Sequence, residues 1–505
     1  MKADDCRLTT EDLRLKTEDL RLTTDDWRLT TTAAAVLVAL FLLFLSAPRA
    51  QAALTEAARL AAVYDTILAA KFDDASAQLT NTCPPAPEEA CQSLAVVSLW
   101  WQIQLDPESH LLDGRFTDLA EKSVAASEAW TRREPRRGEA WFYLAGSYAP
   151  LVQWRVLRGE RLAAAREGNK IREALERALA LDPSLNDAYF GIGLYHYYAD
   201  VAPAAAKFLR WMLALPGGDR AKGLQEMLTA RDRGELLRGE ADYQLHLIYL
   251  WYEHDTPKAL RLLDGLDRRF PSNPLFLQRI AEVESVYVHD EPASAAAWQK
   301  LIARTRSGEV SYRPRVAEAR ARLGLAAALD AMYETDRAID ELQTVLQMNP
   351  TEPPGARARA RLLLDRATAK MAIEPYRLSI MGWRALERGA LDQAETMLAR
   401  AVELAPLDAV ARYRYARLLE ARGDAAGARD ALEEIIARRP LAPPIVLAST
   451  YVDYARLLEH AGDRARALVM YRSALDIVGG DPRAHEEAVR AIKRLSGNGA
   501  RETFF

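Results

Sequence analysis

Residues 378–406, LSIMGWRALERGALDQAETMLARAVELAP, decide the fold, because their pattern returns 34 positions later in residues 412–440, RYRYARLLEARGDAAGARDALEEIIARRP. Small residues, large apolar residues, a glycine and a proline recur at the same places in both stretches. The recurring pairs are Gly382 and Ala416, Gly389 and Gly423, Ala394 and Ala428, Leu398 and Leu432, Ala401 and Ile435, and Pro406 and Pro440. A third copy follows an insertion at 442–446 and contains Tyr451, Ala455, Gly462, Ala467, Tyr471 and Ala474.

Each copy predicts two antiparallel helices joined by a tight turn. The small residues let the two helices approach closely, the glycine suits a left-handed turn between them, and the proline stops the second helix. These positions are therefore expected to form scaffold. Upstream the same frame continues with more substitutions, at Ala259, Leu263, Pro271, Ala293, Ala338, Leu342, Val345 and Pro350.

This pattern resembles the tetratricopeptide repeat (TPR), whose unit of about 34 residues is a helix pair. The resemblance implies an all-α fold, a TPR-like right-handed solenoid of antiparallel helix pairs. It is strongest over 375–482 and decreases towards the N-terminus. Residues 189–224 also resemble the inclusion-body-clearance TPR family. We expect a divergent helical region at 53–240, degenerate units at 241–370, regular units at 371–497 and a tail at 498–505.

The first 52 residues are expected to lie outside the array. Residues 1–32 contain the tandem CRLTTED, LRLKTED, LRLTTDD, which has too many threonines for a coiled coil and is interpreted as unstructured or as translated from a misassigned start. Residues 33–52, with the apolar run AAAVLVALFLLFL, are typical of a signal peptide. We predict cleavage after Ala52 and a periplasmic or cell-envelope location. The alternative is an uncleaved anchor, which would be the chain's membrane contact.

Two cysteines remain after this cleavage, Cys83 and Cys91, in the segment NTCPPAPEEACQS. In an oxidising compartment such a close pair predicts a local disulfide where two helices connect. Two unrelated free thiols are the alternative. Two cysteines without a histidine at ligand spacing are too few for a structural zinc site.

Charge and motifs argue against several classes of function. The 67 basic residues nearly balance 71 acidic ones, so we predict no nucleic-acid partner. The seven histidines form no metal-binding motif. Gly191 and Gly193 lack the third glycine and the preceding strand of a dinucleotide loop. We therefore predict no catalytic residues, no metal and no cofactor, and expect that the chain is not an enzyme.

The TPR resemblance implies that the first helix of each unit lines a concave face. Arginine can bind carboxylates through two parallel hydrogen bonds, and Trp or Tyr can act as a flat anchor. This face is therefore expected to bind a protein or peptide partner, although half of its residues could instead pack against neighbours. The repeat frame places nine side chains on it: Tyr376, Ser379, Trp383, Tyr413, Arg417, Glu420, Val452, Arg456 and Glu459.

The front half presents aromatic residues, and an extra stretch at 152–170 lengthens one of its hairpins. The aromatics predict either a pocket for a hydrophobic small molecule or ordinary core packing. The leading hypothesis is an exported TPR scaffold or adaptor that binds a protein or peptide in the cell envelope. The alternative is a component that binds a hydrophobic or organic-acid small molecule for a transporter. The candidate pocket residues are Phe142, Phe190, Leu194, Tyr197 and Tyr198.

Overall fold

The computed structural model describes residues 54–201, 217–348 and 355–497. The tandem at 1–32, the predicted signal peptide at 33–52 and the tail at 498–505 lie outside these residues, so the predictions made for them stay predictions. In the described part of the chain the secondary structure is helical, with no strand.

The helices follow one another along the whole described sequence. In the front half they are α2 (Ala57–Leu68), α3 (Phe72–Thr82), α4 (Glu88–Leu105), α5 (Asp113–Arg133), α6 (Gly138–Leu157), α7 (Arg161–Leu181), α8 (Ala188–Val201) and α10 (Arg220–Arg233). The middle contains α11 (Arg238–Trp251), α12 (Thr256–Arg269), α13 (Pro274–Val283), η1 (Glu284–Val288), α14 (Glu291–Arg306), α15 (Pro314–Ala331), α16 (Thr335–Gln347) and α17 (Ala356–Ala372). The C-terminal units contain α18 (Glu374–Glu387), α19 (Leu391–Leu404), α20 (Ala409–Ala421), α21 (Ala425–Ala437), η2 (Arg439–Leu441), α22 (Pro444–His460), α23 (Arg464–Leu475) and α24 (Pro482–Gly497).

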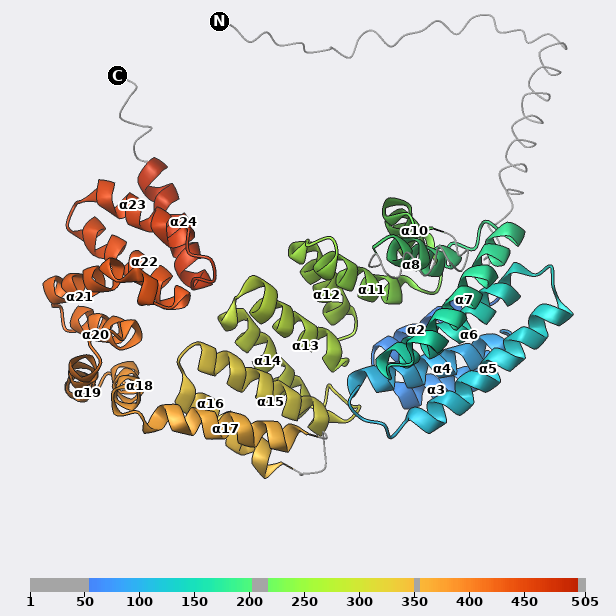
Figure 1. The fold of residues 1–505 in the computed structure, drawn as a ribbon, viewed down its shortest axis with the longest axis horizontal. Coiled ribbons are helices and arrows are strands. Elements are labelled where there is room, and N and C mark those ends of the chain that lie inside the picture. Colours follow the sequence, from blue (N-terminus) through green and yellow to red (C-terminus); the bar gives the residue numbers. More distant parts are fainter. Residues whose placement is uncertain (1–53, 202–216, 349–354, 498–505) are drawn as a thin grey trace, which may run out of the picture. The chain divides into compact units, whose positions relative to one another are not determined.

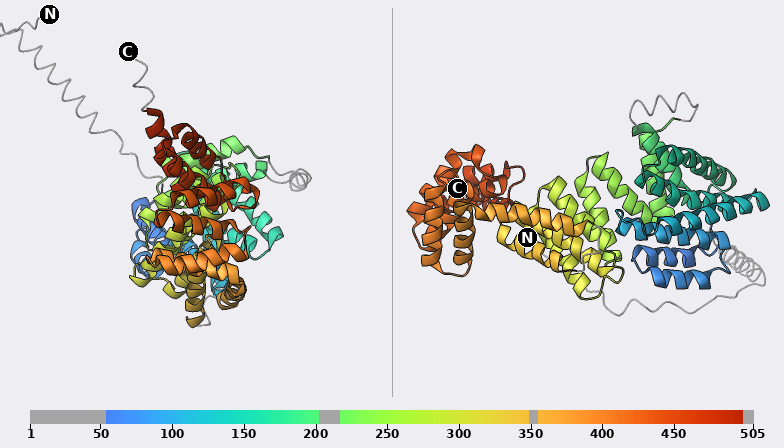
Figure 2. Two further views of the ribbon diagram at one scale, coloured as in Figure 1. Left: turned by 90° about the vertical axis from the view of Figure 1, so that its left-hand side faces the viewer. Right: turned by 60° about the horizontal axis from the view of Figure 1, so that its bottom comes forward.

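Consecutive helices pack in antiparallel pairs, which confirms the predicted all-α array (Figure 1). The regular pairs are α18 with α19, α20 with α21 and α22 with α23. The turn within each pair carries the predicted glycine with a left-handed backbone, with φ of 74°, 82° and 86° at Gly389, Gly423 and Gly462. Figure 2 shows the pairs from two other sides.

The middle units form the same turn without glycine. His254 lies between α11 and α12 with φ 53°, and Tyr333 lies between α15 and α16 with φ 62°. A non-glycine residue in this region costs about 1–3 kcal/mol. The fold tolerates this cost because the flanking helices are packed on both sides, and the missing glycines explain why these units look degenerate in sequence.

One expectation about the repeat frame is wrong by one residue. The frame placed Ala293 at the small position that Ala259 fills in the preceding unit, but the structure buries Ser294 there and leaves Ala293 partly exposed. The cause is η1, a π-helical stretch that directly continues α13. A π-helix adds a residue to a helical turn, so every later position of this unit shifts by one.

Close helix contact explains the small residue in the first regular unit. A Cβ atom built on Gly382 would lie 2.6 Å from Cγ of Leu398, well inside van der Waals contact. Only glycine lets α18 and α19 approach this closely. Pro406 also agrees with the prediction, because α19 ends at Leu404, just before it.

The front half departs most from a regular array. The predicted long hairpin is present as α6 and α7, with 20 and 21 residues, against 14 in each of α18 and α19.

Helices α2 to α4 also pack against the N-terminal ends of helices far along the chain. Buried Glu240 of α11 accepts hydrogen bonds from Tyr64 Oη (3.1 Å) and Trp101 Nε1 (3.2 Å). Asn273, the N-cap of α13, donates to Leu68 O at 2.7 Å. These contacts join residues 54–105 and the middle units in one hydrophobic core.

Candidate binding face

The first helices of the regular units carry all nine side chains predicted for the concave face. Ser379 and Val452 are buried, and the other seven are partly exposed. Tyr376, Ser379 and Trp383 lie on α18, Tyr413, Arg417 and Glu420 lie on α20, and Val452, Arg456 and Glu459 lie on α22.

Asp453 of α22 connects several of these residues. Its carboxylate accepts a hydrogen bond from Tyr413 Oη (2.9 Å), lies 3.1 Å from Arg417 Nη1 and also pairs with Arg456. Asp453 is only 6 % exposed, so these partners replace its hydration. Burial, and then the charge of Asp453, raise the pKa of Tyr413 well above its usual value, which keeps the hydroxyl a donor. The structure thus brings together Tyr413, Arg417 and Arg456 on consecutive first helices.

The two arginines predicted to bind ligand carboxylates have further acidic partners. Arg417 Nη1 lies 3.0 Å from Glu420 Oε2, and Arg456 Nη1 lies 3.4 Å from Glu487 Oε1. Such partly exposed pairs contribute about 0–1 kcal/mol each, so a ligand carboxylate that binds both nitrogens of one arginine can replace them. An acidic ligand at this face has to compete with these internal acids.

The predicted residues at the two ends of the face are held by other helices. Tyr376 Oη and Thr335 Oγ1 are 2.7 Å apart. Glu459 lies 2.8 Å from Arg494 Nη2 and accepts a hydrogen bond from Tyr471 Oη at 3.1 Å. These contacts fix the two side chains, although neither is fully buried.

Arg414 of α20 has no carboxylate within ion-pair distance among the described residues. It is 5 % exposed and donates from Nη1 to Ser379 Oγ (3.0 Å) and from Nη2 to Tyr333 O (2.6 Å). Its guanidinium carbon lies 5.9 Å from the centre of the Trp383 ring. Burial lowers the pKa of Arg414 to about 10, so the group stays charged at neutral pH. Asp408 and Asp336 act on this charge only from beyond ion-pair distance, so no carboxylate in the described part of the chain binds the guanidinium directly.

The sequence reasoning missed a second row of residues that also follows the repeat. Arg414, Asp453 and Glu487 occupy one equivalent position, and Ile380 fills it in the first unit. Each of the three charged residues contacts the first helix of the preceding unit. A charge recurring at this position, delayed once by the insertion at 442–446, was the signal that could have found them.

The candidate pocket residues of the front half lie in packed cores. Phe142, Phe190 and Tyr197 are buried, whereas Leu194 and Tyr198 are partly buried against the same clusters. Tyr197, Tyr198 and Tyr252 form an edge-to-face group with ring centres 5.6–5.9 Å apart. Burial raises the pKa of Tyr198 to about 12. This is the arrangement expected for core packing.

A cavity of about 210 Å³ lies elsewhere, between α14, α15 and α16. Apolar Ile302, Leu325 and Leu329 line it together with charged residues such as Arg306 and Glu341. None of the five candidate pocket residues lines it. Sites for drug-sized ligands usually enclose about 300–1,000 Å³, so this cavity is small for such a ligand.

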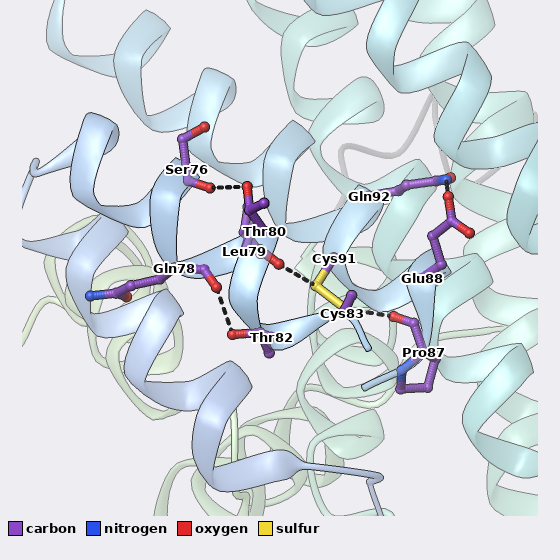
Figure 3. The surroundings of a disulfide bond; sticks show 10 residues. All are labelled: Ser76, Gln78, Leu79, Thr80, Thr82, Cys83, Pro87, Glu88, Cys91 and Gln92. Atoms are coloured by element: carbon purple, nitrogen blue, oxygen red, sulfur yellow. Dashed lines mark hydrogen bonds between the residues drawn. A yellow bond between two sulfur atoms is a disulfide. The ribbon is translucent and has the colours of Figure 1, made fainter. Parts of the chain in front are cut away.

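The predicted disulfide is present between Cys83 and Cys91 (Figure 3). Cys83 follows the last residue of α3 and Cys91 lies in the first turn of α4, with Cα atoms 6.3 Å apart. The bond therefore closes the connection between these two helices.

No group of three or more His, Cys, Asp or Glu side chains in the described part of the chain could hold a metal ion. Among its helices, none combines the length and apolar character needed to cross a membrane.

Comparison with known proteins identifies the repeat. Residues 385–450 match the family described as tetratricopeptide repeat, and no curated protein sequence matches the chain. Similar solved structures include the TPR domain of P58(IPK), with 12 % identity, 81 % of this chain and 99 % of that chain covered and a TM-score of 0.28. A tetratricopeptide repeat protein from Parabacteroides merdae has 13 % identity, coverages of 68 % and 98 % and a TM-score of 0.27. Yeast Tom70 has 14 % identity, coverages of 88 % and 96 % and a TM-score of 0.27. Residues 385–450 thus belong to the tetratricopeptide-repeat family, and this fold generally serves as a non-catalytic scaffold for protein–protein interaction.

Proposed function

We propose that this protein is an exported scaffold or adaptor that binds a protein or peptide partner in the cell envelope through the first helices α18, α20 and α22. The observation that carries the proposal is the row of equivalent residues on this face. Side chains from successive units contact one another around Asp453 and Arg414, and Trp383 and Tyr413 remain partly exposed beside them.

This arrangement suits an extended ligand. Its repeating polar groups can bond to one unit after another, and the two aromatic side chains offer flat apolar contacts. Arg417 and Arg456 are paired directly with carboxylates within the face, whereas Arg414 has no carboxylate of the described ranges at ion-pair distance and interacts with Asp408 and Asp336 only from farther away. An acidic group of the ligand is therefore expected to lie near the α18–α20 end.

The test is recovery of partners from cross-linked envelope extracts. Removing Arg417 and Arg456 alone would leave Asp453 buried without a cation, at a cost of about 3–5 kcal/mol. The variant therefore combines Trp383→Ala, Arg417→Gln and Arg456→Gln with Asp453→Asn. The matched control, Arg429→Ala with Arg472→Ala, removes two exposed arginines from the second helices α21 and α23. Partners should be lost with the first variant alone, and equal recovery from both variants would exclude this face.

Export rests on separate support. The apolar run at 33–45 and the small residues before Ala53 suit a signal peptide, and a disulfide such as Cys83–Cys91 persists in oxidising compartments. N-terminal sequencing of the protein from a periplasmic fraction should begin at Ala53. A start at Met1 would contradict the proposed cleavage.

A further inference from the structure

The π-helical stretch η1 exposes three successive apolar side chains. Val286, Tyr287 and Val288 are between 42 and 60 % exposed. Runs of exposed apolar residues are unfavourable in water unless something covers them, and single π-helical turns occur frequently at functional sites. The exposed apolar residues of η1 are therefore of the kind found in contact surfaces.

A second segment lies beside η1 although it is far away in sequence. Val478, in the turn between α23 and α24, is 83 % exposed. The next residue, Gly479, lies against His289, the residue that ends η1, since a Cβ built on Gly479 would be 3.6 Å from the His289 Cβ. Val286, Tyr287, Val288 and Val478 are together called the η1 surface.

Acidic groups surround the η1 surface. Burial, and then the neighbouring carboxylates Asp290 and Asp264, raise the pKa of Glu284 to about 7. Burial also raises the pKa of Asp290; the nearby Asp481 adds to this shift, and Arg483 opposes it. With a pKa of about 7, Glu284 carries about half a negative charge at neutral pH, and Asp264, Asp290, Asp481 and Glu486 add to it, against the cation Arg483. The acids do not form a metal site in the described residues, so their negative potential is available to a cationic partner.

We propose that the η1 surface is a docking site for a basic segment of another protein, one in which lysine or arginine side chains flank apolar residues. The apolar side chains of that segment would cover Val286, Tyr287, Val288 and Val478, and its cations would lie beside Asp264, Glu284 and Asp290. None of these residues is among the nine side chains predicted for the face of α18, α20 and α22.

Charge decides between the possible occupants of this surface. Membranes with anionic lipids carry the same sign of charge as Asp264, Glu284 and Asp290 and are repelled by these acids. A second copy of this chain would bring the same acids against each other if the contact were symmetric. A basic segment is instead attracted by Asp264, Glu284 and Asp290, and its apolar side chains are buried against the η1 surface.

The experiment uses the full chain and a fluorescein-labelled, 18-residue amphipathic helix with Leu on one face and Lys on the other. A peptide with Glu in place of Lys is the control of opposite charge. Anisotropy gives Kd for wild type and three variants. The apolar variant is Val286→Ser, Tyr287→Ser and Val478→Ser. The acidic variant is Asp264→Asn with Glu284→Gln. The control, Leu362→Ser with Asp365→Asn, changes an exposed apolar residue and an exposed acid on α17.

The Lys/Leu probe should bind the wild type and the control equally, and each of the other two variants should weaken it by about tenfold or more. Added salt should weaken binding further, and the Glu/Leu probe should not bind. A photo-crosslinker in the probe should label 284–290 or 476–481 of the wild type, which tests the site even if a variant folds poorly. Equal binding by all variants, crosslinks elsewhere, binding to phosphatidylglycerol vesicles, or self-association that the apolar variant abolishes would each overturn the proposal.

Discussion

Replacing Asp106 by alanine is expected to open the contact between α4 and α15. Asp106 follows the last residue of α4 and is 2 % exposed. It lies 2.8 Å from Arg313 Nη1 and also pairs with Arg320, which in turn donates to Leu105 O. These partners are more than 200 residues away in sequence, so the carboxylate connects two distant parts of the array.

The size of the effect follows from burial. Removing one partner of a buried ion pair costs about 3–5 kcal/mol. The side chains of Arg313 and Arg320 are 22 % and 19 % exposed, so water recovers part of this loss when Asp106 is removed. We expect a loss of about 2–4 kcal/mol, which accelerates amide exchange at this contact by about 30- to 700-fold.

Hydrogen exchange with peptide resolution is the assay, because a chain of this length need not unfold in one step. Protection should fall in 98–105 and 312–323 and stay unchanged in α18 to α24. The matched control is Asp65→Ala, which removes an ion pair between the same two regions (2.7 Å to Arg269 Nη2) with both side chains about two-fifths exposed. Such a pair contributes about 0–1 kcal/mol. Equal effects of the two variants, or faster exchange throughout the chain, would refute the reasoning.

Three further predictions concern packing, the disulfide and pH. Gly382→Ala places a methyl group against α19 and should destabilise the first regular unit by about 1–3 kcal/mol, whereas Gly265→Ala, on an open face of α12, should stabilise by up to about 1 kcal/mol; urea unfolding measures both. Reduction of Cys83–Cys91, or its double serine variant, should cost about 2–3 kcal/mol for so short a loop; no difference in unfolding between oxidised and reduced protein would contradict this. Burial raises the pKa of Glu240 above its ordinary 4.5, so the folded state binds this proton more tightly than the unfolded state. Its contribution to stability is therefore present below pH 4.5 and is lost as pH rises through the raised value. In Glu240→Gln this loss of stability with rising pH should be absent, which thermal unfolding of wild type and variant at a series of pH values would measure. Identical pH profiles of the two proteins would contradict the assignment.

The regular units could be predicted because their signals are local. Gly389, Gly423 and Gly462 mark the turns by a backbone requirement that glycine meets best, and the helix pairs follow from them. The turn at Tyr333 could not be found this way, because packing rather than residue type imposes its conformation. The one-residue shift after η1 has the same origin, since nothing in ESVYV marks a π-helix.

The repeat frame predicted which helices carry the candidate residues, but it did not predict how the charges of these residues are balanced. The repeat frame identified Arg417 and Arg456, but their pairing with Asp453 depends on the distance between successive first helices. That distance is set by packing, which a single sequence does not give. For the aromatic residues of the front half, the sequence predicted the secondary structure but not the surroundings of the side chains. The sequence showed that Phe142 and Tyr197 are helical, but whether such a ring faces a cavity or a core depends on helices elsewhere in the chain.

The long-range packing of α2 to α4 also has a consequence for how the chain is made. Asp106 meets Arg313 only after 207 further residues have been synthesised. At about 5–20 residues per second, this takes about 10–40 s. During that time the apolar faces of the first helices have no final partner, so the nascent front half cannot complete its core. A chain in this state exposes apolar side chains that chaperones can bind, and its front core is completed only when the middle units have been made.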